Sequence, residues 1–305
     1  MTRGLSILME FGILTACLLI AFGKVTNVFA AEIWTHTIEL GRYKEIIIEG
    51  IIEKGDHKKF IHEVRQGNGQ VGSVLVYSPG GDFYEAMKIG RVIRGLELAS
   101  MVPMQSPQGM PSCDSDKFPF LVEPNHKNNC ICASACFFIH IGGVHRNGTF
   151  MAVHRPYFVK GRFGELPMRD AKIEFVKLQN EARIYMGEMG VPVHIQEDIL
   201  GTSSDKLLLL DEKAVKIYFF GALPYRKEWL LNKCSKLTPE ETARMINYSQ
   251  KFSDAGYSSS VFTSEEKKDR NSISKKLQDE WNCAATESTK SREAAFIKYF
   301  NLSSK

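Results

Sequence analysis

The residue best placed to do chemistry is a serine set among small side chains. Ser134 lies between two alanines in the stretch 130–143, whose sequence is CICASACFFIHIGG. The apolar run 137–141 then predicts a short buried helix with Ser134 at its first turn. A hydroxyl there lies near unpaired backbone N–H groups and the positive end of the helix dipole, and both favour an oxyanion. The competing interpretation is an ordinary N-cap serine on a core helix.

A glycine pair precedes another helix further upstream. The apolar run 74–77 predicts a strand, the turn 78–81 has the sequence SPGG, and a helical pattern covers 83–96. Glycines between a strand and a helix let the backbone approach a ligand closely and leave N–H groups free to point at it. The turn is therefore a candidate binding element.

A histidine follows a predicted strand downstream of the serine. The segment 149–153 has strand character and leads directly into His154, Arg155 and Pro156. A histidine held at the end of a strand is a candidate general base. The alternative is a structural histidine whose ring nitrogens are satisfied by hydrogen bonds.

These three motifs, in this order and at this spacing, resemble the ClpP/crotonase superfamily. The resemblance is greatest to the proteolytic subunit of the Clp protease and to its ClpP-like relatives in the bacterial periplasm, and it extends over residues 44–224. It implies an α/β fold in which a parallel sheet winds as a spiral with helices packed on it. Beyond the matching region, the sequence predicts a C-terminal helical extension.

The resemblance also implies a catalytic triad and an oxyanion hole built from backbone N–H groups. The acid is assigned least directly, because the matching segment contains at least one extra residue before Gly221, so Asp198 and Asp211 stay open. Asp211 also suits the N-cap of the next helix. The implied residues are Ser134, His154 and Asp205 in the triad, and Gly80 or Gly81 together with Ala135 in the oxyanion hole.

The predicted activity is that of an exported serine hydrolase, a ClpP-like peptidase acting on peptides or unfolded segments without a cofactor. No P-loop is present in the sequence, and the glycines of a GxSxG elbow are replaced by Cys132 and Cys136. Two alternatives remain. One is a non-catalytic binding or scaffold protein on the same fold. The other is a Ser–Lys peptidase resembling signal-peptide peptidase A, with Lys160 or Lys172 as the base.

The N-terminus has the pattern of a secretory leader. Arg3 supplies a positive charge, the segment 11–22 is apolar, and small residues precede a cleavage site after Ala30. The apolar run is short for a membrane span, and Glu10 interrupts its extension. We therefore expect a periplasmic or otherwise exported protein, with an uncleaved inner-membrane anchor as the alternative.

Six cysteines remain after the leader, and an even number in an oxidising compartment predicts disulfides. We expect Cys234 to pair with Cys283, and Cys113 to pair with a cysteine near Ser134. A metal site is the rival interpretation, although C-x-C is an unusual spacing for structural zinc. The six cysteines are Cys113, Cys130, Cys132, Cys136, Cys234 and Cys283, and the rival site would use Cys130, Cys132, Cys136 and His140.

Composition and charge predict three regions and no nucleic-acid partner. The net charge of the 305 residues is only +4, with acidic and basic side chains interspersed.

We expect a signal peptide over 1–30, a ClpP/crotonase-like domain over 31–224 and a helical extension over 225–305. A long polar loop spans 105–129, and an amphipathic helix over 168–189 could join copies of the chain into a homo-oligomer.

Overall fold

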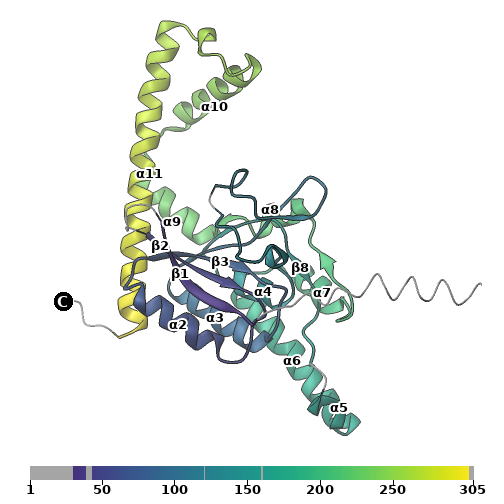
Figure 1. Cartoon of the computed structure of the whole chain (residues 1–305). Coiled ribbons are helices and arrows are strands. Elements are labelled where there is room, and N and C mark those ends of the chain that lie inside the picture. The colour runs from purple at the N-terminus through teal and green to yellow at the C-terminus, as the bar shows by residue number, and fades with distance from the viewer. Residues whose placement is uncertain (1–29, 39–42, 120, 159–160, 302–305) are drawn as a thin grey trace, which may run out of the picture.

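A computed structural model describes residues 30–38, 43–119, 121–158 and 161–301 of the chain. The predicted leader lies outside these ranges, except for Ala30. Within them, no helix is both long and apolar enough to cross a membrane. The fold is mixed α/β, as the sequence predicts, with helices packed on a central six-stranded sheet (Figure 1).

The sheet is parallel in its middle and antiparallel at both edges. Its spatial order is β1-β2-β3-β4-β7-β10, and the neighbours from β2 to β7 pair in parallel. The β1–β2 and β7–β10 pairs are antiparallel. The strands span β1 Glu32–Ile38, β2 Tyr43–Glu49, β3 Val71–Tyr77, β4 Ala99–Met101, β7 His145–Asn147 and β10 Gly221–Ala222.

Helices cover one face of this sheet. Side chains alternate along a strand, so Ile46 and Val74 face the helices while their neighbours Ile47 and Leu75 face the other side. Both sets are fully buried, which explains why β2 and β3 are continuous apolar runs. The covering helices are α2 Asp56–Gln66, α3 Phe83–Gly95, α4 Ala135–His140, α6 Met168–Glu188 and α7 Val193–Gly201.

The long polar loop covers the second face. It contains β5 (Met104–Gln105), β6 (Pro111–Ser112) and the short helix η1 (Lys127–Asn129), and its apolar side chains pack on Ile47 and Leu75. A disulfide joins Cys113 to Cys130. The buried carboxylate of Glu49 accepts hydrogen bonds from two backbone N–H groups of the loop and from the side chain of Asn129, at 2.8–2.9 Å. The loop is therefore part of the core.

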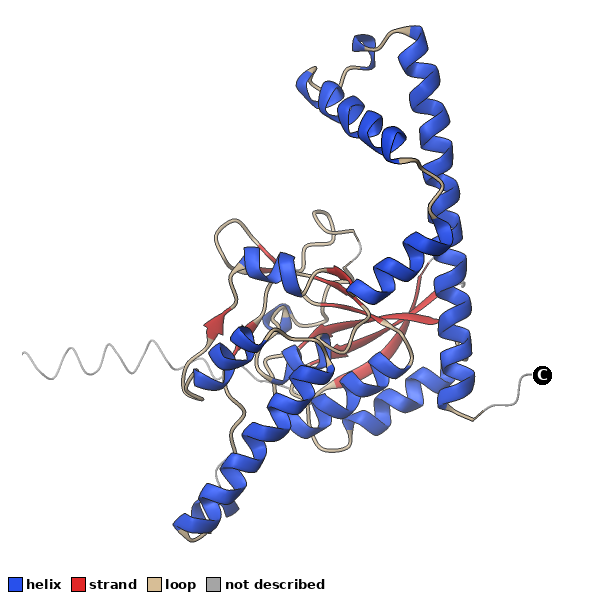
Figure 2. Ribbon diagram, turned by 180° about the vertical axis from the view of Figure 1, so that it is seen from behind, coloured by secondary structure: helices blue, strands red, loops and turns tan. Residues whose placement is uncertain are grey.

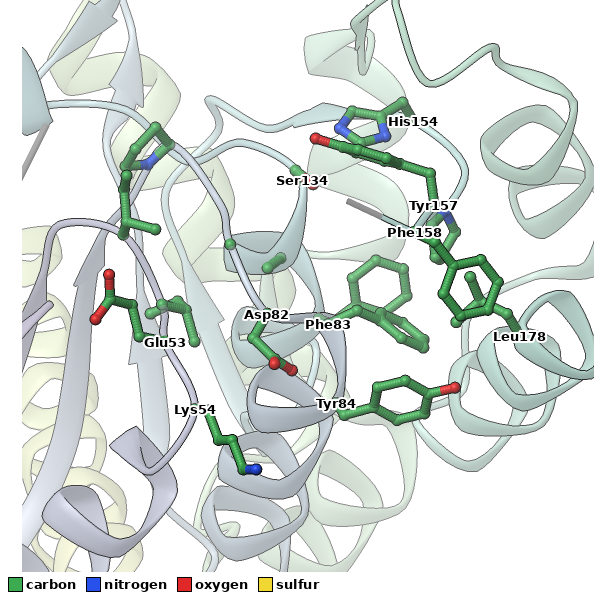
Figure 3. A pocket seen from close by; sticks show the side chains of 17 residues that line it. Glu53, Lys54, Asp82, Phe83, Tyr84, Ser134, His154, Tyr157, Phe158 and Leu178 are labelled. Atoms are coloured by element: carbon green, nitrogen blue, oxygen red, sulfur yellow. The ribbon is translucent and has the colours of Figure 1, made fainter. Parts of the chain in front are cut away.

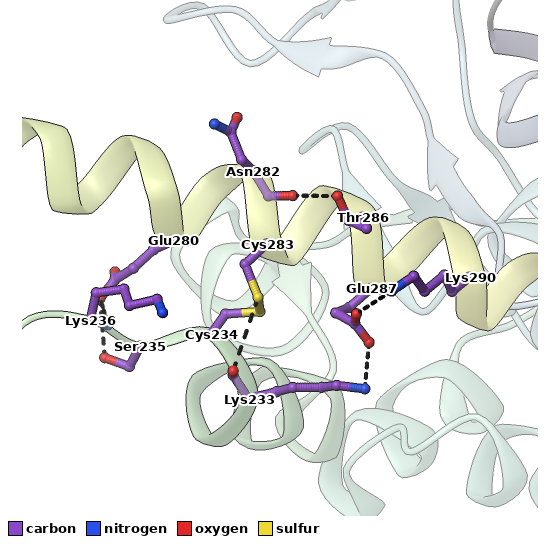
Figure 4. The surroundings of a disulfide bond; sticks show 10 residues. All are labelled: Lys233, Cys234, Ser235, Lys236, Glu280, Asn282, Cys283, Thr286, Glu287 and Lys290. Atoms are coloured by element: carbon purple, nitrogen blue, oxygen red, sulfur yellow. Dashed lines mark hydrogen bonds and ion pairs between the residues drawn. A yellow bond between two sulfur atoms is a disulfide. The ribbon is translucent and has the colours of Figure 1, made fainter.

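The C-terminal extension packs one half of its longest helix on the body and projects the other half (Figures 1 and 2). Capping boxes at Thr238 and Thr263 start α10 and α11. The predicted disulfide between Cys234 and Cys283 ties α9 to α11 (Figure 4). The remaining elements are β8 Ala152–Val153, α5 Arg162–Glu165, β9 Leu208–Leu209, α8 Glu212–Tyr218, α9 Pro224–Cys234, α10 Pro239–Asp254, η2 Ser259–Val261 and α11 Ser264–Tyr299.

One glycine sets how closely α3 approaches the helix that follows Ser134. A Cβ placed on Gly90 would lie 2.7 Å from the carbonyl oxygen of Phe138 in α4 and would overlap the hydroxyl of Tyr185 in α6. That hydroxyl donates a hydrogen bond to the same carbonyl. The three helices therefore meet at a position that has no room for a side chain.

We expect Gly90→Ala to lower the free energy of unfolding by about 1–3 kcal/mol, because the added methyl overpacks this junction. Urea unfolding followed by circular dichroism measures the change. Gly187→Ala is the matched control, since among the described residues no atom outside the adjoining backbone of its own helix lies within 4 Å of the point its methyl would occupy, and helix α6 gains an alanine. An equal loss of stability in both variants would contradict this account of the packing.

Candidate active site

Backbone hydrogen bonds bring the three predicted motifs side by side. Around Ser78 the bonds are strand-like: its N–H donates to the carbonyl of Ile131 at 2.8 Å, and Ala133 N–H donates to the Ser78 carbonyl at 2.9 Å. On the other side, Ser134 N–H donates to the carbonyl of Ala152 at 2.8 Å. The glycine turn, the serine and the segment leading to the histidine are thus adjacent, as the sequence order suggests.

Ser134 has a backbone conformation that non-glycine residues rarely adopt. Its φ is 52° and its ψ is −114°, and it immediately precedes α4. Ser134 occupies the N-cap position of α4, but within the described residues its side chain makes no capping hydrogen bond to the helix. Strained residues of this kind persist only where the surrounding structure holds them, and they cluster at functional sites.

Gly80 lies directly against the serine. Its φ is +119°, and a Cβ built on it would be 2.8 Å from the Cβ and 3.3 Å from the Oγ of Ser134. A side chain at position 80 would therefore displace the hydroxyl. Gly81, with φ +133°, is held still more closely, since a Cβ built on it would be 2.1 Å from the carbonyl oxygen of Ile52. The two glycines are needed for this close approach as well as for the turn.

Two backbone N–H groups beside the serine are available to a ligand. Gly80 N–H donates to the Oγ of Ser78 at 3.1 Å, so it is already used. Within the described residues, the N–H groups of Gly81 and Ala135 have no hydrogen-bond partner. Ala135 is the first residue of α4, where unpaired N–H groups are expected. Of the two upstream N–H groups that the sequence predicts as donors, that of Gly80 is thus already bonded and that of Gly81 is open.

The imidazole of His154 is oriented by the backbone. Its Nδ1 lies 2.8 Å from the carbonyl oxygen of Arg155. A carbonyl only accepts hydrogen bonds, so in the neutral ring Nδ1 carries the proton and Nε2 keeps its lone pair. Within the described residues, Nε2 has no partner, and no hydrogen bond yet joins it to Ser134. The ring of Tyr157 lies alongside, with centroids 5.4 Å apart.

None of the three candidate acids reaches this histidine in the part of the chain that the structure describes. Asp205 is exposed and accepts a short hydrogen bond from the side chain of Ser203. This bond lowers the pKa of the Asp205 carboxyl. A backbone hydrogen bond and the charges of Lys206 and Arg155 lower it to a smaller extent. Asp198 is exposed on α7. Asp211 caps α8 by accepting from Ala214 N–H at 3.1 Å, as predicted for an N-cap.

Ser134 and His154 open into one cavity of about 460 Å³. Figure 3 shows both at the same end, with Tyr157 beside the histidine and apolar rings farther along. The rings of Phe83 and Phe138 meet edge to face, 4.8 Å apart. Lys54 also lines the cavity, whereas Lys172 is exposed on α6 and does not. Lys160 lies outside the described residues.

A disulfide whose partners the sequence does not identify encloses the serine. Cys132 is bonded to Cys136, so the bond closes a loop over Ala133, Ser134 and Ala135. Both cysteines are fully buried. All six cysteines predicted to remain after the leader are thus paired, and no group of side chains in the described ranges could hold a metal ion.

The wall of the cavity at Glu53 and Lys54 is fixed by a buried carboxylate. Glu85 on α3 accepts hydrogen bonds from the backbone N–H groups of Gly55 and His57, from the His57 ring and from Lys88. Burial alone would raise the pKa of Glu85, but these donors, Lys88 foremost, outweigh it and lower the pKa to about 2. The ionised carboxylate therefore anchors the loop that lines the cavity.

Comparison with known proteins adds little to this geometry. No protein-family model matches the chain, and no curated protein matches it. One matching solved structure is a mutant of the membrane-bound stomatin-specific protease 1510-N. It is 16% identical, and the match covers 62% of this chain and 83% of that one with a TM-score of 0.36. We infer neither fold nor activity from a similarity of this size.

We expect Glu85→Gln to destabilise the protein by about 1–3 kcal/mol at neutral pH, because partly buried N–H donors lose their charged acceptor. The wild-type carboxylate has a lowered pKa, so its contribution is complete above pH 4.5 and disappears as the pH falls toward 2. Urea unfolding between pH 2 and 7 should therefore give a shallower pH dependence for the variant.

The control is Glu188→Gln, which removes an exposed carboxylate paired with Arg91. We expect this variant to keep the wild-type stability within about 0.5 kcal/mol. A pH dependence that is identical in wild type and Glu85→Gln would show that Glu85 does not anchor the loop.

Proposed function

We propose that this chain is an exported serine hydrolase, a ClpP-like peptidase that cleaves peptides or unfolded segments. The observation that carries the proposal is the strained backbone of Ser134 beside two available N–H groups. That backbone directs the hydroxyl away from the helix cap and toward the cavity that His154 shares. A hydroxyl, a base with an available lone pair and oxyanion donors are the parts that acyl transfer requires.

In the proposed reaction, Ser134 Oγ attacks the carbonyl carbon of the substrate and His154 Nε2 takes the hydroxyl proton. The carbonyl oxygen becomes an oxyanion, which the N–H groups of Gly81 and Ala135 stabilise. One such donor contributes about 3 kcal/mol to the transition state. His154 then gives its proton to the leaving amine, and water hydrolyses the acyl-enzyme by the same steps in reverse. A small closure must bring Nε2 within hydrogen-bond reach of Oγ.

The Arg155 carbonyl takes the orienting role that an acid has in a triad. It fixes the tautomer and direction of the His154 ring through Nδ1. A neutral carbonyl stabilises the imidazolium less than a carboxylate would. We accordingly propose a Ser134–His154 pair as the catalytic core, with Asp205 outside it.

The cavity walls favour a substrate with a large apolar side chain next to the cleaved bond. Phe83, Phe138 and Leu178 line the space beside the serine, and it is large enough for one side chain and part of the backbone. For the whole chain, we propose a ClpP/crotonase spiral in the domain 31–224, a helical extension over 225–305 and no nucleic-acid partner.

Export and self-association complete the proposal. Three disulfides fit an oxidising compartment, in agreement with a leader cleaved after Ala30. Helix α6 projects from the body (Figure 1), and on one side it exposes Ile173, Val176 and Ile184 by 55%, 47% and 60%. Such an apolar helix face would join copies of the chain into a homo-oligomer.

The test is labelling of the oxidised chain from Ala31 with a fluorophosphonate probe, which reacts with activated serines. We expect wild type to be labelled, and Ser134→Ala and His154→Ala to lose labelling. Asp205→Asn should change the labelling rate by less than about tenfold, far below the loss expected for a triad acid.

Each other result would change the assignment. A folded wild type without labelling would favour a binding or scaffold protein. Labelling that survives His154→Ala would place the base elsewhere, with cavity-lining Lys54 as the first candidate. A loss of several orders of magnitude in Asp205→Asn would restore the aspartate to the triad.

The disulfide around the serine gives a second prediction. We expect the double variant Cys132→Ala and Cys136→Ala to stay folded but label more than about tenfold more slowly, because position 134 can then relax from its strained conformation. The control double variant Cys234→Ala and Cys283→Ala removes a disulfide in the extension and should keep the wild-type rate. Equal rates in wild type and both variants would show that the bond does not position Ser134.

A further inference from the structure

A second cavity lies at the opposite end of the sheet. It is lined by Gly72, Ala99 and His145, which stand at the starts of β3, β4 and β7. The candidate active site follows the other end of β3, beyond Tyr77. Parallel strands keep these ends apart, so the two cavities are separate.

Small side chains on facing walls create the space, about 330 Å³. Ala99 and Ala222 belong to the sheet, while Ala284 and Ala285 belong to α11. Helix α9 supplies a third wall through Arg226 and Leu230. The cavity is therefore formed jointly by the body and the C-terminal extension.

The polar groups of this cavity are unbalanced in charge. Arg226 is buried and its Nη1 lies 3.0 Å from the Oε2 of Glu97, the only carboxylate among the cavity-lining residues described. Ser291 Oγ donates to the same oxygen at 2.6 Å. Glu97 is thus occupied by these two donors, while Arg292 contributes a second guanidinium. Burial, and then the charge of Arg226, lower the pKa of His145, so its ring adds no positive charge at neutral pH.

Arg292 has no ion-pair partner within the described residues. Its Nη2 donates to Thr289 Oγ1 at 3.1 Å, which is a neutral acceptor. Its Nε is buried, and no acceptor for it is present in the described part of the chain. Burial lowers the pKa of Arg292, and the nearby charge of Arg226 lowers it further, whereas Tyr43, Glu293 and Glu97 act in the opposite direction and do not outweigh them. A buried, unsatisfied guanidinium N–H indicates a missing acceptor such as an ion.

We propose that this cavity binds a small oxyanion, presented by a phosphate or carboxylate group, with Arg292 as its principal ligand. A guanidinium donates through Nε and Nη in a planar fork that matches two oxygens of such a group. A small shift of the partly exposed Arg292 side chain would turn the now inaccessible Nε toward the anion, which would also balance the excess positive charge beside Arg226. Since α9 and α11 form two walls, the bound anion also ties the extension to the sheet.

The test is isothermal titration of the oxidised chain from Ala31 with inorganic phosphate and, separately, with succinate, in a buffer of low ionic strength. We expect saturable binding at one site by at least one of these probes, and the tighter probe identifies the group. Arg292→Gln should weaken that binding about tenfold or more, because it removes charge-assisted hydrogen bonds. Hydrogen exchange over 284–292 should slow in wild type when the anion is bound.

The matched control is Arg244→Gln, which removes an arginine from the extension far along α10, where it pairs with Asp269. This variant should bind the anion as wild type does. Circular dichroism confirms that both variants are folded. The proposal is overturned if neither probe binds wild type saturably, if Arg292→Gln binds equally well, or if Arg244→Gln weakens binding to the same extent.

Discussion

The site depends on how the backbone is held on both sides of one serine. On the N-terminal side, Ser134 N–H is bonded to Ala152, and the preceding residue is bonded to Ser78. On the C-terminal side, α4 begins at once and packs on α3 through Gly90. Residue 134 is the single residue between a strand-like segment and a helix. Because both neighbours are held in place, its backbone is held at a positive φ.

This constraint explains why cysteines and glycines surround the serine. The Cys132–Cys136 bond links the strand-like segment to the first turn of α4, so the two supports cannot separate. Gly80 lies so close to the serine that any side chain would collide with it. The N–H groups of Gly81 and Ala135, which belong to the same two supports, have no hydrogen-bond partner in the described part of the chain, so this arrangement leaves two donors open to a ligand.

The elements with local signals could be predicted from the sequence. The strand Val71–Tyr77 follows from its apolar run, and the caps at Asp211 and Thr238 follow from residue type. The conformation of Ser134 could not be predicted, because it results from bonds to residues distant in sequence. The orienting carbonyl of Arg155 carries no side-chain signal at all. The polar composition of 105–129 indicates a surface loop. The segment covers the sheet with only a few apolar residues, and these are too sparse to predict its packing from the sequence.

Helix α11 of the C-terminal extension has different neighbours in its two halves. Near its end, Phe296 of α11 joins the main hydrophobic core and lies 3.7 Å from the point that a Cβ on Gly69 would occupy, so this half is part of the body. Its first half pairs with α10 through ion pairs such as Arg244–Asp269. Between the halves stand Ala284 and Ala285, whose small side chains leave the second cavity open. Arg226 and Arg292 line this cavity, and the charge of Arg226 is one of the causes that lower the pKa of Arg292, so closer packing there would bring two like charges together.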